Sequence, residues 1–180
     1  FFLQPQAANP DPLWSRGLGD VYKRQGDRES NIASSIAMLG SYIEISKIRS
    51  SSFYETEPLY NEDQPAFLNI VLEIETSLTP FKLLDKIREI EKMLGREEKR
   101  IKNQPRTIDI DIVIFKDSFI DTSELQIPHP GALLRNFVLI PLAELIPNEF
   151  FPKTNVKIVD LLKKCPDTSV VQKYIINKKA

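Results

Sequence analysis

Two aspartates separated by one residue, Asp109 and Asp111, lie within the apolar run from Thr107 to Phe115. In a strand, side chains two positions apart point to the same face, so these carboxylates would lie together. Acids in an apolar strand need a partner to stay ionised. Mg²⁺ supplies one, because it binds phosphate substrates through one or two carboxylates and water. The spacing alone leaves an alternative open, a pair of surface acids on an edge strand that form ion pairs with lysine or arginine.

A cluster of cations precedes the acid pair. It comprises Arg96, Lys99, Arg100, Lys102 and Arg106. Phosphoryl transfer uses arginine and lysine around the developing charge, beside a metal at the bridging oxygens. Any one of these residues alone is better explained as a solvated side chain of a connecting loop. Only the position of the whole cluster beside the acid pair favours phosphate chemistry. The sequence has no glycine-rich phosphate loop of the Walker or dinucleotide type, so a site for ATP must be built in another way.

The single histidine, His129, stands between Pro128 and Pro130, and Arg135 follows closely. Proline on both sides restricts the backbone of this segment. A lone histidine is more often structural than catalytic. A rigid segment beside an arginine nevertheless suits a contact with phosphate.

An aromatic ring and an amide, Phe67 and Asn69, lie two positions apart in the alternating run 67–76. They would share one face of a strand. An amide both donates and accepts hydrogen bonds, which matches the edge of a pterin or purine, and aromatic rings stack on the face of such a ligand. Phe137 could supply a second ring. Such a pair alone more often indicates core packing and a turn contact.

Hydrophobic periodicity predicts the elements that position these residues. Helices are expected from Asp27 to Gly40, from Thr79-Pro80 to Leu94, over 137–145 and once or twice in 153–180; strands are expected over 42–54, 67–76 and 107–115. The order helix, strand, strand, helix, strand predicts an α+β sandwich with helices on the faces of an antiparallel-rich sheet.

Composition restricts the classes of protein without indicating a reaction. At 180 residues and a net charge of -1, the chain is long enough for one domain and has no electrostatic footprint for nucleic acid or anionic membrane. The longest apolar runs, such as 112–115, are too short to cross a bilayer. The single cysteine, Cys165, cannot form an internal disulfide and favours a reducing cytoplasm.

Several short sequence segments together resemble the hydroxymethyldihydropterin pyrophosphokinases of folate synthesis. They occur in the order and at the spacings of that family. They are residues 52–59, 64–69, 90–91 with 94–96, 105–111, 127–130 and 135–142. The resemblance implies a ferredoxin-like α+β fold and transfer of pyrophosphate from ATP, a co-substrate, to 6-hydroxymethyl-7,8-dihydropterin, with release of AMP.

The resemblance also implies roles for individual residues. Two Mg²⁺ ions would be held by Asp109 and Asp111, which with Arg96 and Arg106 form the catalytic group. The contacts to ATP would come from Arg96, Arg106, Ile112, His129 and Arg135. The pterin would be bound by Thr56, Glu57, Leu59, Phe67, Asn69 and Phe137, with the two phenylalanines on its faces and Asn69 at its edge. Whether a carboxylate such as Asp111 accepts a proton stays open.

The N-terminus departs from the family pattern. Lys23-Arg24-Gln25 stands where the family's opening strand ends in Gly-Ser-Asn. We therefore expect residues 1–25 to be a non-native or disordered leader and residues 26–180 to form a single pyrophosphokinase domain. We expect a monomer that acts on small molecules, with no nucleic acid and no membrane as a partner. Two alternatives are another metal-dependent phosphate enzyme, such as a nucleotidyltransferase, and a non-catalytic remnant that binds nucleotide or pterin.

Overall fold

The computed structural model describes residues 2–4, 20–57, 66–96, 107–116 and 118–176, and for residues 2–4 and 20–27 it describes the backbone alone. The strands of the main sheet are β1 (Phe2–Gln4), β2 (Ile45–Ser50), β3 (Phe53–Thr56), β4 (Phe67–Thr76), β5 (Asp109–Asp111) and β10 (Val171–Tyr174). The helices are α1 (Asp20–Ser41), α2 (Pro80–Met93), α3 (Asn136–Leu145) and α4 (Ile158–Lys163), with a 3-10 turn at Ala132–Leu134. Two small hairpins pair β6 (Ile120–Asp121) with β7 (Gln126–Ile127) and β8 (Phe150–Phe151) with β9 (Val156–Lys157).

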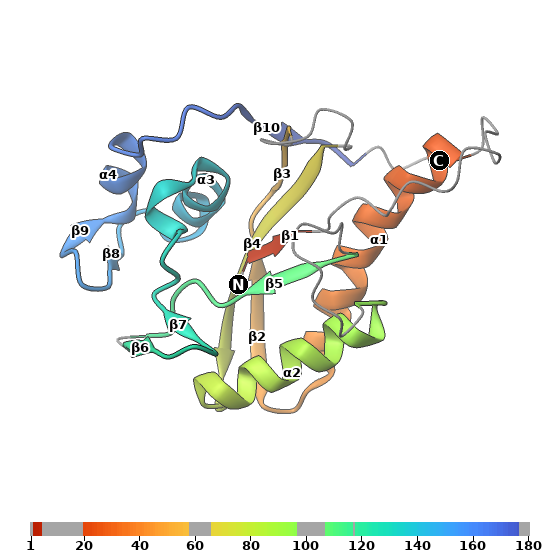
Figure 1. Ribbon diagram of the computed structural model, residues 1–180, viewed down its shortest axis with the longest axis horizontal. Helices are drawn as coiled ribbons and strands as arrows, with labels where there is room; N and C mark the ends of the chain where they lie inside the picture. The colour runs from red at the N-terminus through yellow and green to blue at the C-terminus, as the bar shows by residue number, and fades with distance from the viewer. Residues whose placement is uncertain (1, 5–19, 58–65, 97–106, 117, 177–180) are drawn as a thin grey trace.

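The main sheet is antiparallel and has helices on both sides. Its strand order is β10-β3-β4-β1-β5, and β2 also pairs with β4. Figure 1 shows α1 and α2 on one side of the sheet and α3 and α4 on the other. The expected α+β class is confirmed. No helix among the described residues is long and apolar enough to span a membrane.

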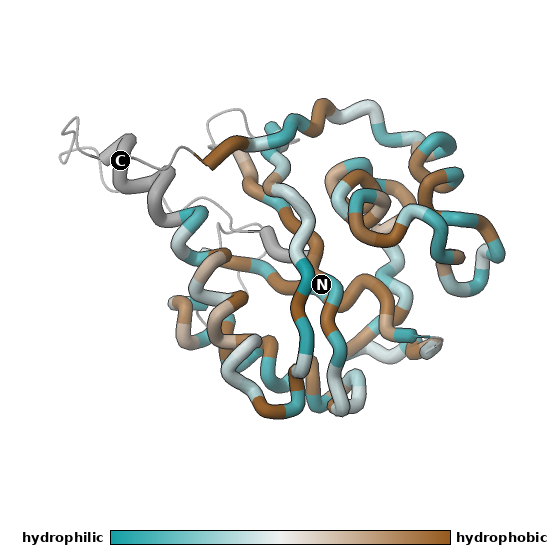
Figure 2. The backbone as a smooth tube through the Cα atoms, turned by 180° about the vertical axis from the view of Figure 1, so that it is seen from behind, coloured by the Kyte–Doolittle hydropathy of each residue, from teal (hydrophilic) through white to brown (hydrophobic). Residues whose placement is uncertain are grey.

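Alternation along β4 separates two hydrophobic cores. Leu68 and Ile70 are fully buried in the core beneath α1 and α2, where they join Leu83 and Ile87 of α2. Val71 points to the opposite face and packs in a second core with the apolar residues of α3 and α4. The tube in Figure 2 accordingly carries both hydrophobic and hydrophilic positions along its strands. The residues that share the face of Val71 therefore point toward α3.

The helix expected from Thr79-Pro80 is confirmed. Thr79 is the N-cap of α2, and its side chain accepts a hydrogen bond from the Lys82 N–H at 3.4 Å. Pro80 occupies the first turn, where its missing N–H has no helical partner to lose. The chain leaves the helix through Gly95, whose φ of +93° is a conformation that side chains with a Cβ rarely adopt.

The single strand expected over 42–54 is wrong, because a bulge divides it. Both β2 and β3 pair with β4, but three residues lie between Ser50 and Tyr54 whereas two lie between their partners Leu72 and Asn69. Inside the bulge, the Ser51 hydroxyl accepts a hydrogen bond from the Val71 N–H at 3.0 Å, as a strand carbonyl would. A serine side chain thus replaces the backbone acceptor that the extra residue displaces.

The bulge also anchors α3. Glu144, near the C-terminal end of α3, accepts hydrogen bonds from the Ser52 N–H at 3.1 Å and the Ser52 hydroxyl at 2.7 Å. The same carboxylate accepts a hydrogen bond from the Tyr54 hydroxyl at 2.8 Å. The extra residue in the strand therefore places a serine where it can hold the end of a helix.

Other predicted boundaries need correction. The strand expected over 107–115 is limited to β5, because the carbonyl of Val113 accepts the His129 N–H at 2.9 Å instead of joining the sheet. The first helix begins at Asp20 rather than Asp27, and α3 begins at Asn136 rather than Phe137. In the described part of 153–180 the expectation of one or two helices is met by α4, and the strands β9 and β10 were not expected.

Part of the expected leader lies inside the sheet. Phe2 pairs with Val71 of β4 on one side and with Asp111 of β5 on the other. Residues 1 and 5–19 lie outside the described part of the chain. Whether residues 1–25 belong to the domain stays a prediction, but the backbone of β1 connects β4 to the strand of the acid pair.

Candidate active site

The two aspartates of the acid pair lie on β5, with Ile110 between them. Ile110 is buried in the core beneath α1 and α2, whereas Asp109 and Asp111 are partly exposed. Because β5 is extended through both aspartates, their carboxylates project from the same face. The structure thus gives the pair the arrangement that its spacing indicated.

Arg96 and a buried glutamate flank Asp109. The Arg96 guanidinium lies 3.2 Å from the Asp109 carboxylate and also forms an ion pair with Glu91. Glu91 is only 3 % exposed, and it accepts the Ile110 N–H at 2.9 Å. Glu91 therefore ties α2, β5 and Arg96 together.

Sequence reasoning did not select Glu91 as a functional residue, although a signal was present. Along α2 it stands four positions after Ile87 and eight after Leu83, on the face that the helix buries. A glutamate on such a face is buried, and buried carboxylates are usually paired or hydrogen-bonded. That pattern could have identified Glu91 before the structure was known.

Burial and charge act in opposite directions on the carboxylates here. Burial raises the pKa of Glu91, while the charge of Arg96 and the Ile110 N–H oppose that rise. Burial, and next the charge of Asp109, raise the pKa of Asp111, against the lowering effect of His129, Arg135 and Arg96. Three basic groups therefore act on one partly buried carboxylate, which is the electrostatic environment that a polyphosphate requires.

His129 and Arg135 lie beside each other across a glycine. The Gly131 N–H donates to His129 Nδ1 at 3.2 Å, so the other ring nitrogen, Nε2, carries the proton and can donate to a ligand. A Cβ at Gly131 would lie 3.3 Å from both the Arg135 guanidinium carbon and the His129 ring. Glycine at this position lets the two side chains approach.

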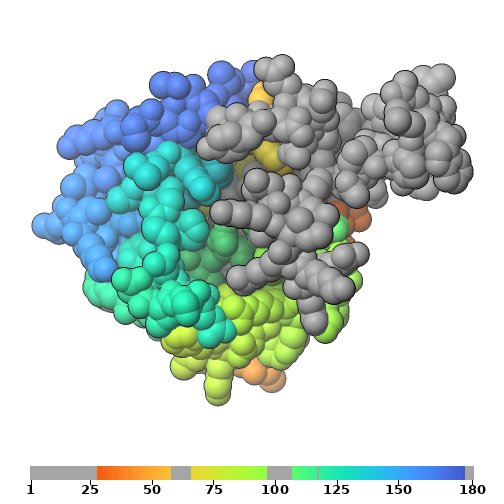
Figure 3. Space-filling view, viewed as in Figure 1, coloured from red at the N-terminus to blue at the C-terminus, as the bar shows by residue number. Residues whose placement is uncertain are grey.

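A hollow of about 340 Å³ opens beside the acid pair, and its lining includes Asp111, Ile112 and His129. In Figure 3 the green atoms around residue 110 lie at the bottom of a recess, with the teal atoms of the segment around residues 125–137 as one wall. Among the described residues, no group of three or more His, Cys, Asp or Glu side chains could hold a metal ion. Two carboxylates still fit Mg²⁺, since phosphate oxygens and water complete its coordination.

The ring and amide of β4 face α3. Phe67, Asn69 and Val71 alternate on one face, and Val71 packs in the same core as Phe137 of α3. Phe137 is 8 % exposed, and the Arg135 guanidinium lies over its ring, 5.6 Å from the centroid. The two rings and the amide are thus on the same side of the sheet.

Asn69 has a hydrogen-bonding group without a partner. The side chain is completely buried, and its Nδ2 donates to Thr56 Oγ1 at 2.9 Å. Among the described residues no hydrogen bond reaches its Oδ1. A buried acceptor without a partner costs about 1–3 kcal/mol, which a ligand N–H would recover.

The remaining predicted contacts fall at the edge of the described chain. Thr56 is 4 % exposed and holds the Asn69 amide, while Glu57 is exposed. Leu59 and Arg106 lie outside the described residues. The structure therefore assembles Arg96, His129 and Arg135 around the acid pair and leaves those two positions undescribed.

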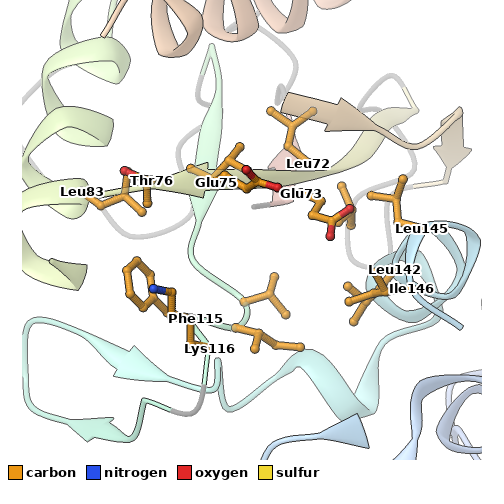
Figure 4. A pocket seen from close by; sticks show the side chains of 14 residues that line it. Leu72, Glu73, Glu75, Thr76, Leu83, Phe115, Lys116, Leu142, Leu145 and Ile146 are labelled. Carbon is orange, nitrogen blue, oxygen red and sulfur yellow. The ribbon is translucent and has the colours of Figure 1, made fainter. Parts of the chain in front are cut away.

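A second hollow, of about 330 Å³, is lined mainly by apolar residues. Figure 4 shows Leu142, Leu145 and Ile146 on one side of it and Phe115 on another. It lies beside the C-terminal half of α3, and none of the predicted site residues lines it. The predicted site and this hollow are distinct.

The family model of 7,8-dihydro-6-hydroxymethylpterin-pyrophosphokinase (HPPK) matches residues 20–147, more than half of the chain. The chain belongs to the HPPK family. The resemblance inferred from the sequence is thereby confirmed, and all of the predicted site residues fall inside the matched range. A nucleotidyltransferase is no longer a competing assignment.

Individual relatives agree with the HPPK family model. The 2-amino-4-hydroxy-6-hydroxymethyldihydropteridine pyrophosphokinase of Bacillus subtilis is 44 % identical over 120 residues, which are 67 % of this chain and 71 % of the relative. The protein of the same name from Aquifex aeolicus is 46 % identical over 136 residues, 76 % of this chain and 81 % of the relative. The bifunctional protein FolKE of Lactococcus lactis subsp. cremoris is 42 % identical over 125 residues, 69 % of this chain but only 36 % of the relative.

Proposed function

We propose that this chain transfers pyrophosphate from ATP to 6-hydroxymethyl-7,8-dihydropterin and releases AMP. The observation that carries the proposal is the acid pair of β5 with Arg96, His129 and Arg135 acting on it. Relatives with the same family match are named as pyrophosphokinases. Phosphoryl transfer depends mainly on positioning and on stabilisation of charge, which this arrangement supports.

Asp109 and Asp111 would hold Mg²⁺, and the proposal includes two ions. The metal supplies neutralisation of the negative charge on the triphosphate. Arg96, which already contacts Asp109, would lie beside the same phosphates. Arg96 also pairs with Glu91. That ion pair would keep the Arg96 guanidinium on this side of β5 when the Asp109 carboxylate binds Mg²⁺.

The ATP contacts would come from His129 and Arg135, together with Arg106 and Ile112. The proton on His129 Nε2 and the guanidinium of Arg135 can both donate to phosphate oxygens. Ile112 lies in the lining of the hollow beside Asp111 and would supply an apolar or backbone contact.

The pterin would bind between Phe67 and Phe137, with Asn69 at its edge. The buried Oδ1 of Asn69 can accept from a pterin N–H, while Thr56 fixes the amide by accepting from its Nδ2. Thr56, Glu57 and Leu59 would supply further contacts. A substrate without matching donors would leave the Asn69 acceptor unpaired, which gives the site its selectivity.

The finer features of the molecule belong to the same proposal. The order β1, α1, β2, β4, α2, β5, with α1 and α2 on the same side of the antiparallel sheet, supports a ferredoxin-like topology. We also propose that residues 26–180 form one pyrophosphokinase domain, with a leader whose described residues contribute β1 to its sheet, and that the chain acts as a monomer in the cytoplasm. The proposed substrates are small molecules, with no role for nucleic acid or membrane.

The test is AMP release from ATP and Mg²⁺, with and without the pterin alcohol. The intact chain is compared with an Asp109→Ala, Asp111→Ala double variant, and with Asp85→Ala as a control that removes an exposed carboxylate from α2. We expect pterin-dependent AMP that the double variant loses and the control keeps. No AMP from a folded chain would favour a non-catalytic remnant, and nucleotide hydrolysis independent of pterin would favour a different phosphate reaction.

A further inference from the structure

The segment that follows α4 connects two walls of the predicted pterin site. From Lys164 it runs without regular structure to β10, and Val171 of β10 pairs with Thr56 at the end of β3. Thr56 in turn holds the amide of Asn69. We call residues 164–174 the strap. The C-terminal end of the strap is therefore fixed to the wall of the site that the sheet forms.

The other end of the strap binds the N-terminus of α3. The Asp167 carboxylate accepts a hydrogen bond from the Asn136 N–H at 2.7 Å, and the Asn136 side chain donates to the Asp167 carbonyl. Arg135, at the N-cap position of α3, makes no side-chain capping hydrogen bond. Asp167 therefore supplies the cap from 31 residues away, where an anion also complements the helix dipole.

The capped residue lies between two predicted substrate contacts. Arg135 and Phe137 flank Asn136, and the Arg135 guanidinium lies over the Phe137 ring. Only three residues separate Asp167 from Val171. A short stretch of chain thus sets the distance between the first turn of α3 and the end of β3.

The electrostatics of Asp167 agree with a permanent cap. Burial acts to raise the pKa of its carboxyl, but hydrogen bonds from Ser169 and Asn136 and the charge of Arg135 hold that pKa below its ordinary value. The Ser169 N–H donates at 2.8 Å and fixes the second carboxylate oxygen. Asp167 is therefore ionised at neutral pH, with both oxygens engaged.

The strap lies beyond the region that the family model matches, which ends at residue 147. We propose that Asp167 is a positioning residue for the pterin site, acting through the first turn of α3 on Arg135 and Phe137. This inference rests on the proposed function, because it assigns the pterin to the space between α3 and β4.

The variant Asp167→Ala removes both side-chain acceptors. We expect the KM for 6-hydroxymethyl-7,8-dihydropterin to rise about 5-fold to 30-fold, as for the loss of a helix cap, with a smaller change in kcat. Asp167→Asn keeps one acceptor oxygen in a residue that caps helices well, and should restore the KM to within about 3-fold of the intact chain.

Tyr174→Phe is the matched control. It removes the hydrogen bond of 2.6 Å from the Tyr174 hydroxyl to Glu29 of α1, so it loosens the same part of the chain without touching α3. We expect a lower thermal midpoint and an unchanged pterin KM. An unchanged KM in Asp167→Ala, or an equal rise in Tyr174→Phe, would overturn the proposal.

Amide hydrogen exchange separates this inference from the function itself. In Asp167→Ala the amides of Asn136 and the following turn should exchange faster, while those of α2 should not change. Unaltered exchange at Asn136 would overturn the role of the strap even in an active enzyme. An intact chain without pterin-dependent AMP release would instead overturn the proposed function, whatever the exchange shows.

Discussion

At the scale of single residues, Glu91 determines where Arg96 lies. Its carboxylate is buried, accepts the Ile110 N–H and pairs with Arg96, whose backbone N–H also bonds to the Glu91 carbonyl at 2.9 Å. The desolvation of such a carboxylate is unfavourable unless its partners are kept. Glu91 therefore affects both the free energy of unfolding and the position of a predicted phosphate contact.

Replacing Glu91 by alanine should reduce stability and turnover together. The Ile110 N–H and Arg96 each lose a buried partner, so we expect the free energy of unfolding to fall by about 3–5 kcal/mol. Glu91→Gln keeps an acceptor for Ile110 and should retain more of the stability while losing the ion pair. Urea denaturation and AMP release measure the two effects, and wild-type values in Glu91→Ala would contradict this role.

At the scale of elements, α3 is held at both ends, by Asp167 at its start and by Glu144 near its end. Burial, then the hydrogen bond to Glu144 and its charge, raise the pKa of Tyr54 to about 12. In the unfolded chain a tyrosine titrates near 10. The stability that this group contributes is therefore complete below about pH 10 and is lost as pH rises toward about 12.

Tyr54→Phe tests this anchor. The folded state keeps the proton that the unfolded chain releases above about pH 10, so the stability of the intact chain should decline more steeply between about pH 10 and 12 than that of the variant. Chemical denaturation at a series of pH values gives the difference in the free energy of unfolding between the two proteins. The other tyrosines are present in both proteins, so their contributions cancel in this difference. Parallel curves for the two proteins would show that the Glu144 contact contributes nothing to the docking of α3.

The elements that could be predicted were those with local signals. Thr79-Pro80 marked the start of α2, and alternation marked β4 over its full length. The bulge at Ser51 could not be predicted, because it depends on a hydrogen bond from Val71, 20 residues away. β10 was missed since its exposed polar residues show little alternation, and its pairing with β3 alone makes it a strand.

The same distinction applies to the site. The spacing of Asp109 and Asp111 already predicted their common face, which β5 provides. The position of Glu91 on the buried face of α2 indicated that it is paired, but not with what, because its partner Ile110 lies 19 residues away in sequence. Asp167 had no such local signal, and its partner Asn136 lies 31 residues away. Contacts between distant segments are set by tertiary packing, and a single sequence carries no direct record of them.

At the scale of the whole molecule, the two halves of the proposed site meet across β1. Asn69 lies on β4, the acid pair lies on β5, and β1 pairs with both strands. The registers place Leu3 opposite Ile70 on one side and opposite Ile110 on the other. The distance from the pterin contacts to the metal ligands therefore depends on a strand of three residues.

Leu3→Pro tests whether this strand holds the site together. Proline removes a backbone donor and is poorly tolerated in a strand that pairs on both sides. We expect a loss of about 2–4 kcal/mol, or a fall in Tm of about 5–15 °C, and a matching loss of pterin-dependent AMP release. Leu3→Ile, which keeps the N–H and suits a strand, should change neither quantity. If the proline variant matched the isoleucine variant in both measurements, the pairing of β1 would be dispensable, and the edges of β4 and β5 would have to be satisfied in another way.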